Sequence, residues 1–151
     1  MEIFLEKCKN DQHRDGNIVY IAKLESNELC PVAYTKLFIN RCGFDMTKNE
    51  EAFLIPRLFA TKKGHIASID KGISYTRTRE IFMEFIKPVT KRNLNLGLHS
   101  CRSGGASAAA ENEVSERLIS KHGRWNTTKA RDGYIKDSVS KRLKITKSLG
   151  L

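Results

Sequence analysis

The chain has 151 residues, enough for one domain with a hydrophobic core and too few for two comfortable ones. Its hydrophobic content of 40% and charged content of 29% are typical of a globular protein and exclude a disordered one. No apolar run approaches the roughly 20 residues of a membrane-spanning helix, so we expect no membrane partner. The N-terminus has an acidic residue at position 2 and no cationic lead-in, so we expect a chain that is not secreted.

The net charge of +10 is distributed unevenly along the chain. Residues 1–75 carry 11 Lys or Arg and 10 Asp or Glu, whereas residues 76–151 carry 16 and 7. A basic surface is the electrostatic signature of a nucleic-acid-binding protein, because each phosphate that it neutralises releases counterions. The second half is therefore a candidate nucleic-acid-binding surface, although a solvated basic face would have the same composition.

The four cysteines lie at positions 8, 30, 42 and 101, and their spacings match no metal-binding pattern. We expect them to be reduced thiols that are buried or half-buried. The sequence therefore predicts no metal site.

The first elements in chain order form a β-hairpin over about residues 1–24. Two short stretches that contain alternating or continuous apolar residues flank the polar sequence KNDQHRDGN. Asp15-Gly16 is a turn signal within that sequence. The connection is longer than a tight hairpin needs, so we expect Lys9 near a protruding tip.

Helices and loops are predicted over residues 31–92. Pro31 is placed to open the first helix, and Gly43 is placed to end it. A polar loop follows this helix.

A short apolar stretch over residues 53–60 is expected to be a strand or an extended segment, because Pro56 interrupts it. Residues 61–74 are expected to form a loop, with Gly64 and Gly72 as turn residues.

A strong helix pattern covers residues 74–91. Ser74 can cap this helix, and Pro88 limits its end. The pattern predicts a buried apolar stripe that consists of Ile81, Phe82, Phe85 and Ile86.

Three more helices are predicted over residues 98–135. The first starts near Leu98 and contains the small-residue sequence SGGASAAA, which lets its backbone approach a neighbour closely. The second ends at Gly123, and the third begins after a cap at Asn126 or Thr127. A tail over residues 136–151 follows, with apolar residues at Val139, Leu143 and Ile145. Together the elements predict an α+β fold, mainly α, with a small β-hairpin or sheet near the N-terminus.

Four side chains in this last part have the chemistry of a phosphoryl-transfer site. His99 and Arg102 are three residues apart, so on a helix they share a face. A guanidinium matches phosphate oxygens, and an imidazole can donate a hydrogen bond or move a proton. Trp125 offers an indole N–H, and the Tyr134 hydroxyl can attack a phosphorus atom. Each residue alone also has a structural explanation, namely a surface pair, a core tryptophan and a packed tyrosine.

The sequences HSCRSGGASAAA, HGRW and ARDGYI resemble the catalytic C-terminal domain of the tyrosine recombinases, the phage-integrase family. The family signature is H-x-x-R, then a His or Trp after a Gly-rich turn, then the nucleophilic tyrosine. The form with GRW and DGYI is similar to recombinases tied to animal mobile elements. The resemblance covers nearly all of the chain and implies one partial, helical recombinase catalytic domain over residues 1–151.

The resemblance implies a role for each of the four side chains. Tyr134 would form a 3′-phosphotyrosyl bond with double-stranded DNA, and Arg102 would hold the scissile phosphate. His99 would assist proton transfer and phosphate binding, and Trp125 would pack beside the phosphate and donate a hydrogen bond to it. No metal or nucleotide cofactor is implied, because the phosphotyrosyl bond stores the energy for rejoining.

The family has two further catalytic cations, and the sequence departs from the pattern at one of them. A lysine on a hairpin turn protonates the leaving 5′ oxygen; Lys9 is the best match for it and Lys7 is the runner-up. An arginine upstream of this hairpin has no counterpart, because no arginine precedes Lys9. We therefore expect that the chain is N-terminally truncated and also lacks the family's DNA-clamping domain. Loss of such a cation costs about 10²–10⁴ in rate.

Three functions remain open from the sequence. The first is DNA strand cleavage and rejoining, that is, DNA recombination or integration. The second is a truncated remnant that only binds DNA, and the third is a basic helical domain that binds RNA or an acidic partner. The resemblance also implies a nuclear location, with the cytoplasm as the alternative. It further implies that the tail over residues 136–151 docks on a neighbouring protomer on DNA, although the tail could instead pack on its own domain.

Overall fold

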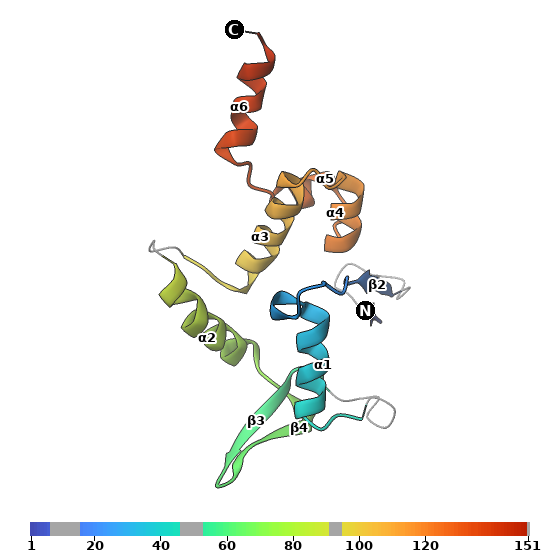
Figure 1. Cartoon of the computed structure of the whole chain (residues 1–151), viewed down its shortest axis with the longest axis vertical. Coiled ribbons are helices and arrows are strands. Elements are labelled where there is room, and N and C mark those ends of the chain that lie inside the picture. The colour runs from blue at the N-terminus through green and yellow to red at the C-terminus, as the bar shows by residue number, and fades with distance from the viewer. Residues whose placement is uncertain (7–15, 46–52, 91–94, 151) are drawn as a thin grey trace. The chain divides into compact units, whose positions relative to one another are not determined.

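The structure is a computed structural model and describes residues 1–6, 16–45, 53–90 and 95–150 (Figure 1). These residues form six α-helices and four short β-strands, so the predicted α+β and mainly helical fold is confirmed. The chain divides into two compact units, Met1–Glu84 and Phe85–Leu151. The expectation of one catalytic domain over residues 1–151 stays a prediction.

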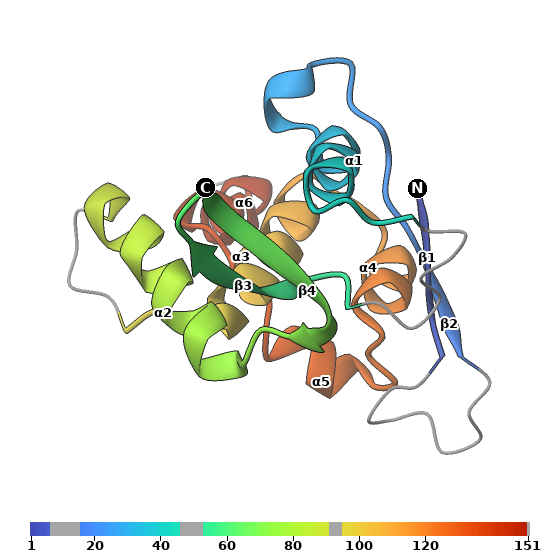
Figure 2. The ribbon, with the colours of Figure 1, turned by 90° about the horizontal axis from the view of Figure 1, so that it is seen from below.

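The first unit begins with the predicted N-terminal hairpin. Strand β1 (Glu2–Leu5) pairs antiparallel with β2 (Asn17–Tyr20), and the two run side by side in Figure 2. Met1 and Ile21 extend the ladder by one pair, because each donates a hydrogen bond to the carbonyl of the other at 2.8 Å. The connection that carries Lys9 lies outside the described residues.

Helix α1 (Pro31–Arg41) follows a short 3-10 turn, η1 (Asn27–Leu29). It begins with Pro31, as predicted, because the first turn of a helix needs no N–H donor at that position. Gly43 follows its end with a φ of +69°, a left-handed conformation that glycine adopts without strain. Cys30 precedes the helix and is fully buried, and its Sγ accepts the Leu24 N–H at 3.3 Å.

A second hairpin occupies residues that the sequence analysis assigned partly to a loop. Strand β3 (Pro56–Thr61) confirms the expected extended segment, and it pairs antiparallel with β4 (Gly64–Gly72). The loop expected over residues 61–74 is therefore wrong. Of that prediction, only the turn at Gly64 is confirmed, since Gly64 has a φ of +128° at the tight connection between β3 and β4. The strand forms because its apolar side chains pair with those of β3 across the ladder.

Helix α2 (Tyr75–Ile86) forms where it was predicted, and the 3-10 turn η2 (Lys87–Val89) ends it. The Ser74 hydroxyl caps the helix by accepting the Arg77 N–H at 3.2 Å. The expected buried stripe is wrong, because no α2 side chain is buried and Phe85 is 75% exposed. The other three residues of the expected stripe are half-buried, so the apolar face of α2 is only partly covered. The residues of that stripe are Ile81, Phe82, Phe85 and Ile86.

The second unit consists of helices; three of them were predicted, whereas α6 forms in the segment that was predicted as a tail. Their bounds are α3 (Leu98–Glu111), α4 (Glu116–Gly123), α5 (Thr128–Asp132) and α6 (Val139–Ser148). Thr127 is the cap of α5, and its hydroxyl accepts the Ala130 N–H at 3.2 Å. Helix α4 ends where Arg124 takes a left-handed φ of 57°. Across the ranges that the structure describes, no helix is long and apolar enough to cross a membrane.

The small-residue part of α3 contributes to the core at one position. Ala106 is buried on α3, and Ile119 is buried on the neighbouring α4. Gly104 and Gly105 have a different environment, because a Cβ added to either would meet no described atom within 4 Å. Within this unit, close helix packing therefore uses Ala106 and does not require the two glycines.

The tail forms helix α6, which is held at its start by α3. The Lys141 ammonium donates to the Ala110 carbonyl, and Lys144 forms an ion pair with Glu113 at 3.2 Å. These contacts satisfy a carbonyl at the C-terminal end of α3. The exposed apolar side chains of the tail are Val139, Leu143, Ile145 and Leu149.

Three of the four cysteines lie in the described residues, and all three are free thiols. Cys30 is buried and Cys42 is half-buried, as expected, and burial raises the pKa of the Cys42 thiol. Cys101 is exposed on α3, which corrects the expectation for that residue.

Because so few side chains are buried, the contact between α3 and α4 should dominate the stability of the second unit. Ile119→Ala removes a side chain that is only 5% exposed, and we expect it to lower the free energy of unfolding by about 2–5 kcal/mol. The neighbouring Leu118 is 48% exposed, so Leu118→Ala should cost less than about 1 kcal/mol. Chemical denaturation followed by circular dichroism measures both, and equal losses would contradict this account of the core.

Candidate active site

Four of the five side chains that the sequence analysis selected lie together in the second unit. His99 and Arg102 are on α3, Trp125 follows α4, and Tyr134 follows α5. The ring centroids of Trp125 and Tyr134 are 5.2 Å apart, and those of His99 and Tyr134 are 6.4 Å apart. Residues from three helices therefore converge around the Tyr134 ring.

The Arg102 guanidinium connects this cluster. Its central carbon lies 4.5 Å from the Trp125 ring and 5.3 Å from the Tyr134 ring, both within the range of a cation–π contact. One of its N–H groups donates to the Gly123 carbonyl. A guanidinium carries five N–H donors, so several can still face an anion. Arg102 is therefore a fixed positive charge beside two adjacent aromatic rings.

His99 is the exposed member of the cluster, whereas Arg102, Trp125 and Tyr134 are half-buried. Its ring is tilted by 32° from the Tyr134 ring. His99 and Arg102 share one face of α3, as their spacing predicts. A ligand that approaches from solvent can therefore contact the imidazole and the guanidinium at the same time.

Gly123 shapes the site, and the sequence analysis did not select it as a site residue. Its carbonyl accepts the Arg102 hydrogen bond, and a Cβ at this position would overlap the Trp125 ring. The position therefore requires glycine because of the close approach of the indole. The signal for this role is the glycine that stands two residues before the tryptophan in HGRW.

The backbone around Tyr134 is tied to α3 by two serines that the sequence analysis also missed. The Ser103 hydroxyl donates to the Tyr134 carbonyl at 2.6 Å, and the Ser107 hydroxyl lies 3.4 Å from the same oxygen. Ser107 also accepts the Lys136 N–H at 2.9 Å. The small-residue sequence suggested helix packing alone, but two of its members make hydrogen bonds to the segment that carries the tyrosine.

Arg131 holds α5, the helix that precedes Tyr134, in its position. It is only 6% exposed, and it pairs with Asp132 at 2.8 Å and with Glu116 of α4 at 2.9 Å. The hydrogen bond with Asp132, and then that with Glu116, raise the pKa of the Arg131 guanidinium. A buried charge with two partners orients the helix that precedes Tyr134.

The remaining selected residue is Lys9, which lies outside the described residues together with its runner-up, Lys7. Their place relative to the cluster stays a prediction.

The cluster is partly open to solvent, since His99 is exposed and the other three side chains are half-buried. A cavity of about 650 Å³ in the second unit is lined by none of the four selected side chains. Its lining is mostly charged and includes Arg131 and its partners Glu116 and Asp132. An open cluster suits a long polymeric ligand better than a small molecule, which is normally bound in a concave apolar site.

The arrangement has the parts for chemistry on a phosphate ester. The Tyr134 ring lies beside a cation, an imidazole and an indole. In the described residues, no hydrogen bond holds the Tyr134 hydroxyl. Cationic donors stabilise the charge that develops on phosphate oxygens, and a hydroxyl can act as nucleophile when a base accepts its proton.

Comparisons with known proteins returned no matching protein-family model, no similar curated protein and no similar solved structure.

The close approach at Gly123 gives a direct test of the site geometry. Gly123→Ala should displace the Trp125 ring and cost about 1–3 kcal/mol of stability, because the added methyl overpacks the contact. Gly105→Ala is the matched control, since a Cβ there meets no described atom within 4 Å and should stabilise the helix by about 0.5–1 kcal/mol. Trp125 is the single tryptophan, so its fluorescence reports the displacement directly. Unchanged emission in Gly123→Ala would contradict this geometry.

Proposed function

We propose that this chain is the catalytic domain of a tyrosine recombinase, which cuts and rejoins double-stranded DNA through Tyr134. The observation that carries the proposal is the convergence of Tyr134, Arg102, His99 and Trp125 from three helices. Their sequence spacing resembles the family signature, and their side chains share one open cluster. Chance resemblance of scattered motifs would not require this proximity.

In the proposed reaction, the Tyr134 hydroxyl transfers its proton to the His99 imidazole and attacks the scissile phosphorus. The bond between phosphorus and the 5′ oxygen breaks as the tyrosyl–phosphorus bond forms. The leaving 5′ oxygen takes up a proton, which we assign to Lys9 on the basis of the resemblance. Rejoining is the reverse, in which a 5′ hydroxyl attacks the phosphotyrosine and releases Tyr134.

Arg102 supplies the positive charge for this step. Its free N–H groups would bind the non-bridging phosphate oxygens, whose negative charge grows in the transition state. His99 would donate a second hydrogen bond from the same helix face, and the Trp125 indole would donate a third. The bond energy is kept in the phosphotyrosine, so the reaction needs no nucleotide cofactor.

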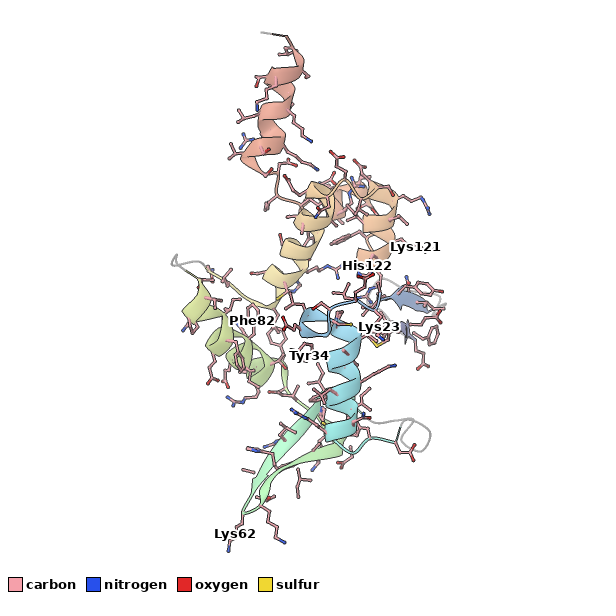
Figure 3. All side chains as sticks on the ribbon, viewed as in Figure 1. Lys23, Tyr34, Lys62, Phe82, Lys121 and His122 are labelled. Carbon is pink, nitrogen blue, oxygen red and sulfur yellow. The ribbon has the colours of Figure 1, made fainter. Side chains whose placement is uncertain are left out.

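Charge supports DNA as the substrate. Residues 85–151 carry 14 Lys or Arg and 5 Asp or Glu. A second basic cluster lies within the first unit, where residues 56–79 carry six Lys or Arg and one Asp. Figure 3 shows Lys62 at the free tip of the β3–β4 hairpin, and Lys121 and His122 near the end of α4. Both regions can neutralise backbone phosphates.

The β3–β4 hairpin, which carries part of this second basic cluster, also borders a cavity. A cavity of about 580 Å³ beside the hairpin is lined by Arg57, His65 and Arg77, among others. Two-stranded ribbons fit the major groove of DNA, where such side chains reach phosphates on either side. We therefore include this hairpin in the proposed DNA-binding surface.

DNA binding without cleavage is the second candidate function. The basic side chains of the chain suffice for this candidate, because neutralisation of backbone phosphates needs no nucleophile. This candidate predicts retention of DNA that does not depend on Tyr134. Stronger binding to RNA than to duplex DNA would instead favour the third possibility, an RNA-binding domain.

Self-association on DNA is proposed for α6. Val139 and Ile145 on this helix and Leu149 at its C-terminal end are each more than 60% exposed. Together they give one short helix a large exposed apolar area. A nuclear location is proposed on the resemblance alone.

The adduct assay tests the proposed cleavage. The chain is incubated with a duplex library in which randomised bases surround one 5′-bridging phosphorothiolate, whose thiol leaves without a proton donor and does not rejoin. Protein-linked DNA is then recovered under denaturing conditions. We expect adducts from the native chain, none from Tyr134→Phe, and a loss of about 10²–10³ in rate from Arg102→Ala.

The matched control is Tyr75→Phe, which removes the hydroxyl of another exposed tyrosine. It should leave the adduct yield unchanged. Adducts from Tyr134→Phe, or none from the native chain, would contradict the proposed cleavage.

The salt dependence of DNA binding tests the hairpin. Lys62→Ala/Lys63→Ala should reduce the slope of log affinity against log salt by about 2, because each phosphate contact contributes about 0.9. Lys23→Ala/Lys36→Ala removes the same charge from exposed positions elsewhere in the first unit and serves as the control. Equal slopes for the two double variants would exclude the hairpin from the DNA-binding surface.

A further inference from the structure

We propose that the cavity between the β3–β4 hairpin and α2 binds the terminal phosphate of a nucleoside 5′-phosphate, either as a free nucleotide or as the 5′ end of a DNA strand. This proposal goes beyond the recombinase chemistry, because the cavity belongs to the first unit, whereas the four clustered side chains belong to the second. It assigns the first unit a ligand-binding site of its own.

The cavity has the size of a small-molecule site. Its volume is about 580 Å³, within the range of concave sites that bind single small ligands. Strands β3 and β4 supply one part of its wall, and the first two turns of α2 supply another. A continuous duplex is too wide to enter a concave site of this size, whereas a single nucleotide or a strand end can enter it.

The charged side chains that line the cavity are positive. Arg57, Arg77 and His65 line it, and the described part of its lining includes no Asp or Glu. The Ser74 hydroxyl also lines it; it accepts the Arg77 N–H at 3.2 Å and can donate its own proton to an anion. A phosphate monoester carries about −1.5 to −2 charges at pH 7, whereas a carboxylate or a phosphodiester carries one. Two permanent cations therefore match a terminal phosphate best.

Neighbouring side chains hold both arginines. The Arg77 guanidinium donates to the Glu80 carboxylate at 3.0 Å, and both partners are exposed, so this ion pair is weak and can yield to a phosphate. The central carbon of Arg57 lies 5.1 Å from the centroid of the Phe59 ring, within the range of a cation–π contact. Both guanidinium groups keep further N–H donors for an anion. Their partial ordering before binding lowers the entropic cost of holding a ligand.

Apolar side chains form much of the remaining wall. Leu58 on β3, Ile73 before α2 and Ile81 on α2 line the cavity. Arg77 and Ile81 are four residues apart, so they share one face of α2. An apolar wall beside two cations suits a ligand that has a phosphate at one end and a less polar body. The three apolar side chains offer no hydrogen bonds to the edge of a base, so we expect little preference among bases.

Nucleotide binding to the full chain tests the phosphate site. Adenosine 5′-monophosphate (AMP) is titrated calorimetrically, and adenosine is the matched ligand that lacks the phosphate. We expect adenosine to bind at least about 10-fold more weakly than AMP, and Arg77→Ala to lower the affinity for AMP by about 10-fold, because each loses charge-assisted hydrogen bonds. Arg41→Ala removes an exposed arginine at the end of α1 and should leave the affinity unchanged.

A competition experiment distinguishes the two sources of the phosphate. Labelled AMP is displaced with duplexes of one sequence whose overhanging 5′ ends carry either a phosphate or a hydroxyl. If the cavity takes strand ends, the phosphorylated duplex should displace AMP at a concentration at least about 10-fold lower than the other. If the cavity takes only free nucleotides, the two duplexes should displace AMP equally poorly. Both results support a site for a nucleoside 5′-phosphate.

Three results would overturn the proposal. The first is absence of AMP binding together with equal binding of the phosphorylated and hydroxyl duplexes. The second is equal affinity for AMP and adenosine, and the third is an equal loss of AMP affinity in Arg77→Ala and Arg41→Ala, which would indicate attraction to charge in general. None of these results bears on the recombinase chemistry, because the adduct assay reports on Tyr134 and not on this cavity.

Discussion

The candidate site depends on one interaction, the contact of the Arg102 guanidinium with the adjacent rings of Trp125 and Tyr134. Its central carbon lies 4.5 Å from the first ring and 5.3 Å from the second, and one N–H donates to the Gly123 carbonyl. These contacts join the end of α4 and the end of α5 to α3. Without this cation, the cluster would lose its permanent positive charge and keep only the hydrogen-bond donors of His99 and Trp125.

The contacts of Arg102 with the two rings also depend on residues outside the four clustered side chains. Gly123 leaves room for the indole, and Ser103 ties the tyrosine backbone to the helix that bears the arginine. Arg131 orients α5 by pairing with Glu116 across to α4. Each of these residues fixes the position of another residue. Together they bring side chains from α3 and from the ends of α4 and α5 into one cluster. A site held this way is fixed by backbone contacts although it lies open to solvent.

Sequence patterns predicted α3, α4 and α5 of the second unit well, because caps and glycines mark their ends, but they did not predict α6 in the tail. They also selected the four clustered side chains, since H-x-x-R spacing places two of them on one helix face. The pattern failed where the partner of a segment decided its structure. The strand Gly64–Gly72 has weak alternation and forms by pairing with the strand before it. The stripe on α2 was expected to be buried from its period alone, but Phe85 is exposed and the other three residues are only half-buried.

The site residues that were missed act through the backbone. Ser103 and Ser107 belong to a small-residue stretch, and nothing in that stretch indicates a carbonyl about 30 positions away as their partner. Long-range hydrogen bonds of this kind depend on how the helices fold back on each other. They can be found in the structure and not in the spacing of residues along the chain.

Peptide mapping of trapped protein–DNA adducts tests the central claim most directly. Trypsin cleaves after Arg131 and Lys136, so the peptide Asp132–Lys136 contains Tyr134 as its single tyrosine. The account predicts that this peptide carries a phosphonucleotide remnant after nuclease digestion of the adduct. A remnant on any other residue, or an unmodified peptide from chain that retains DNA, would contradict the assignment of Tyr134 as the nucleophile.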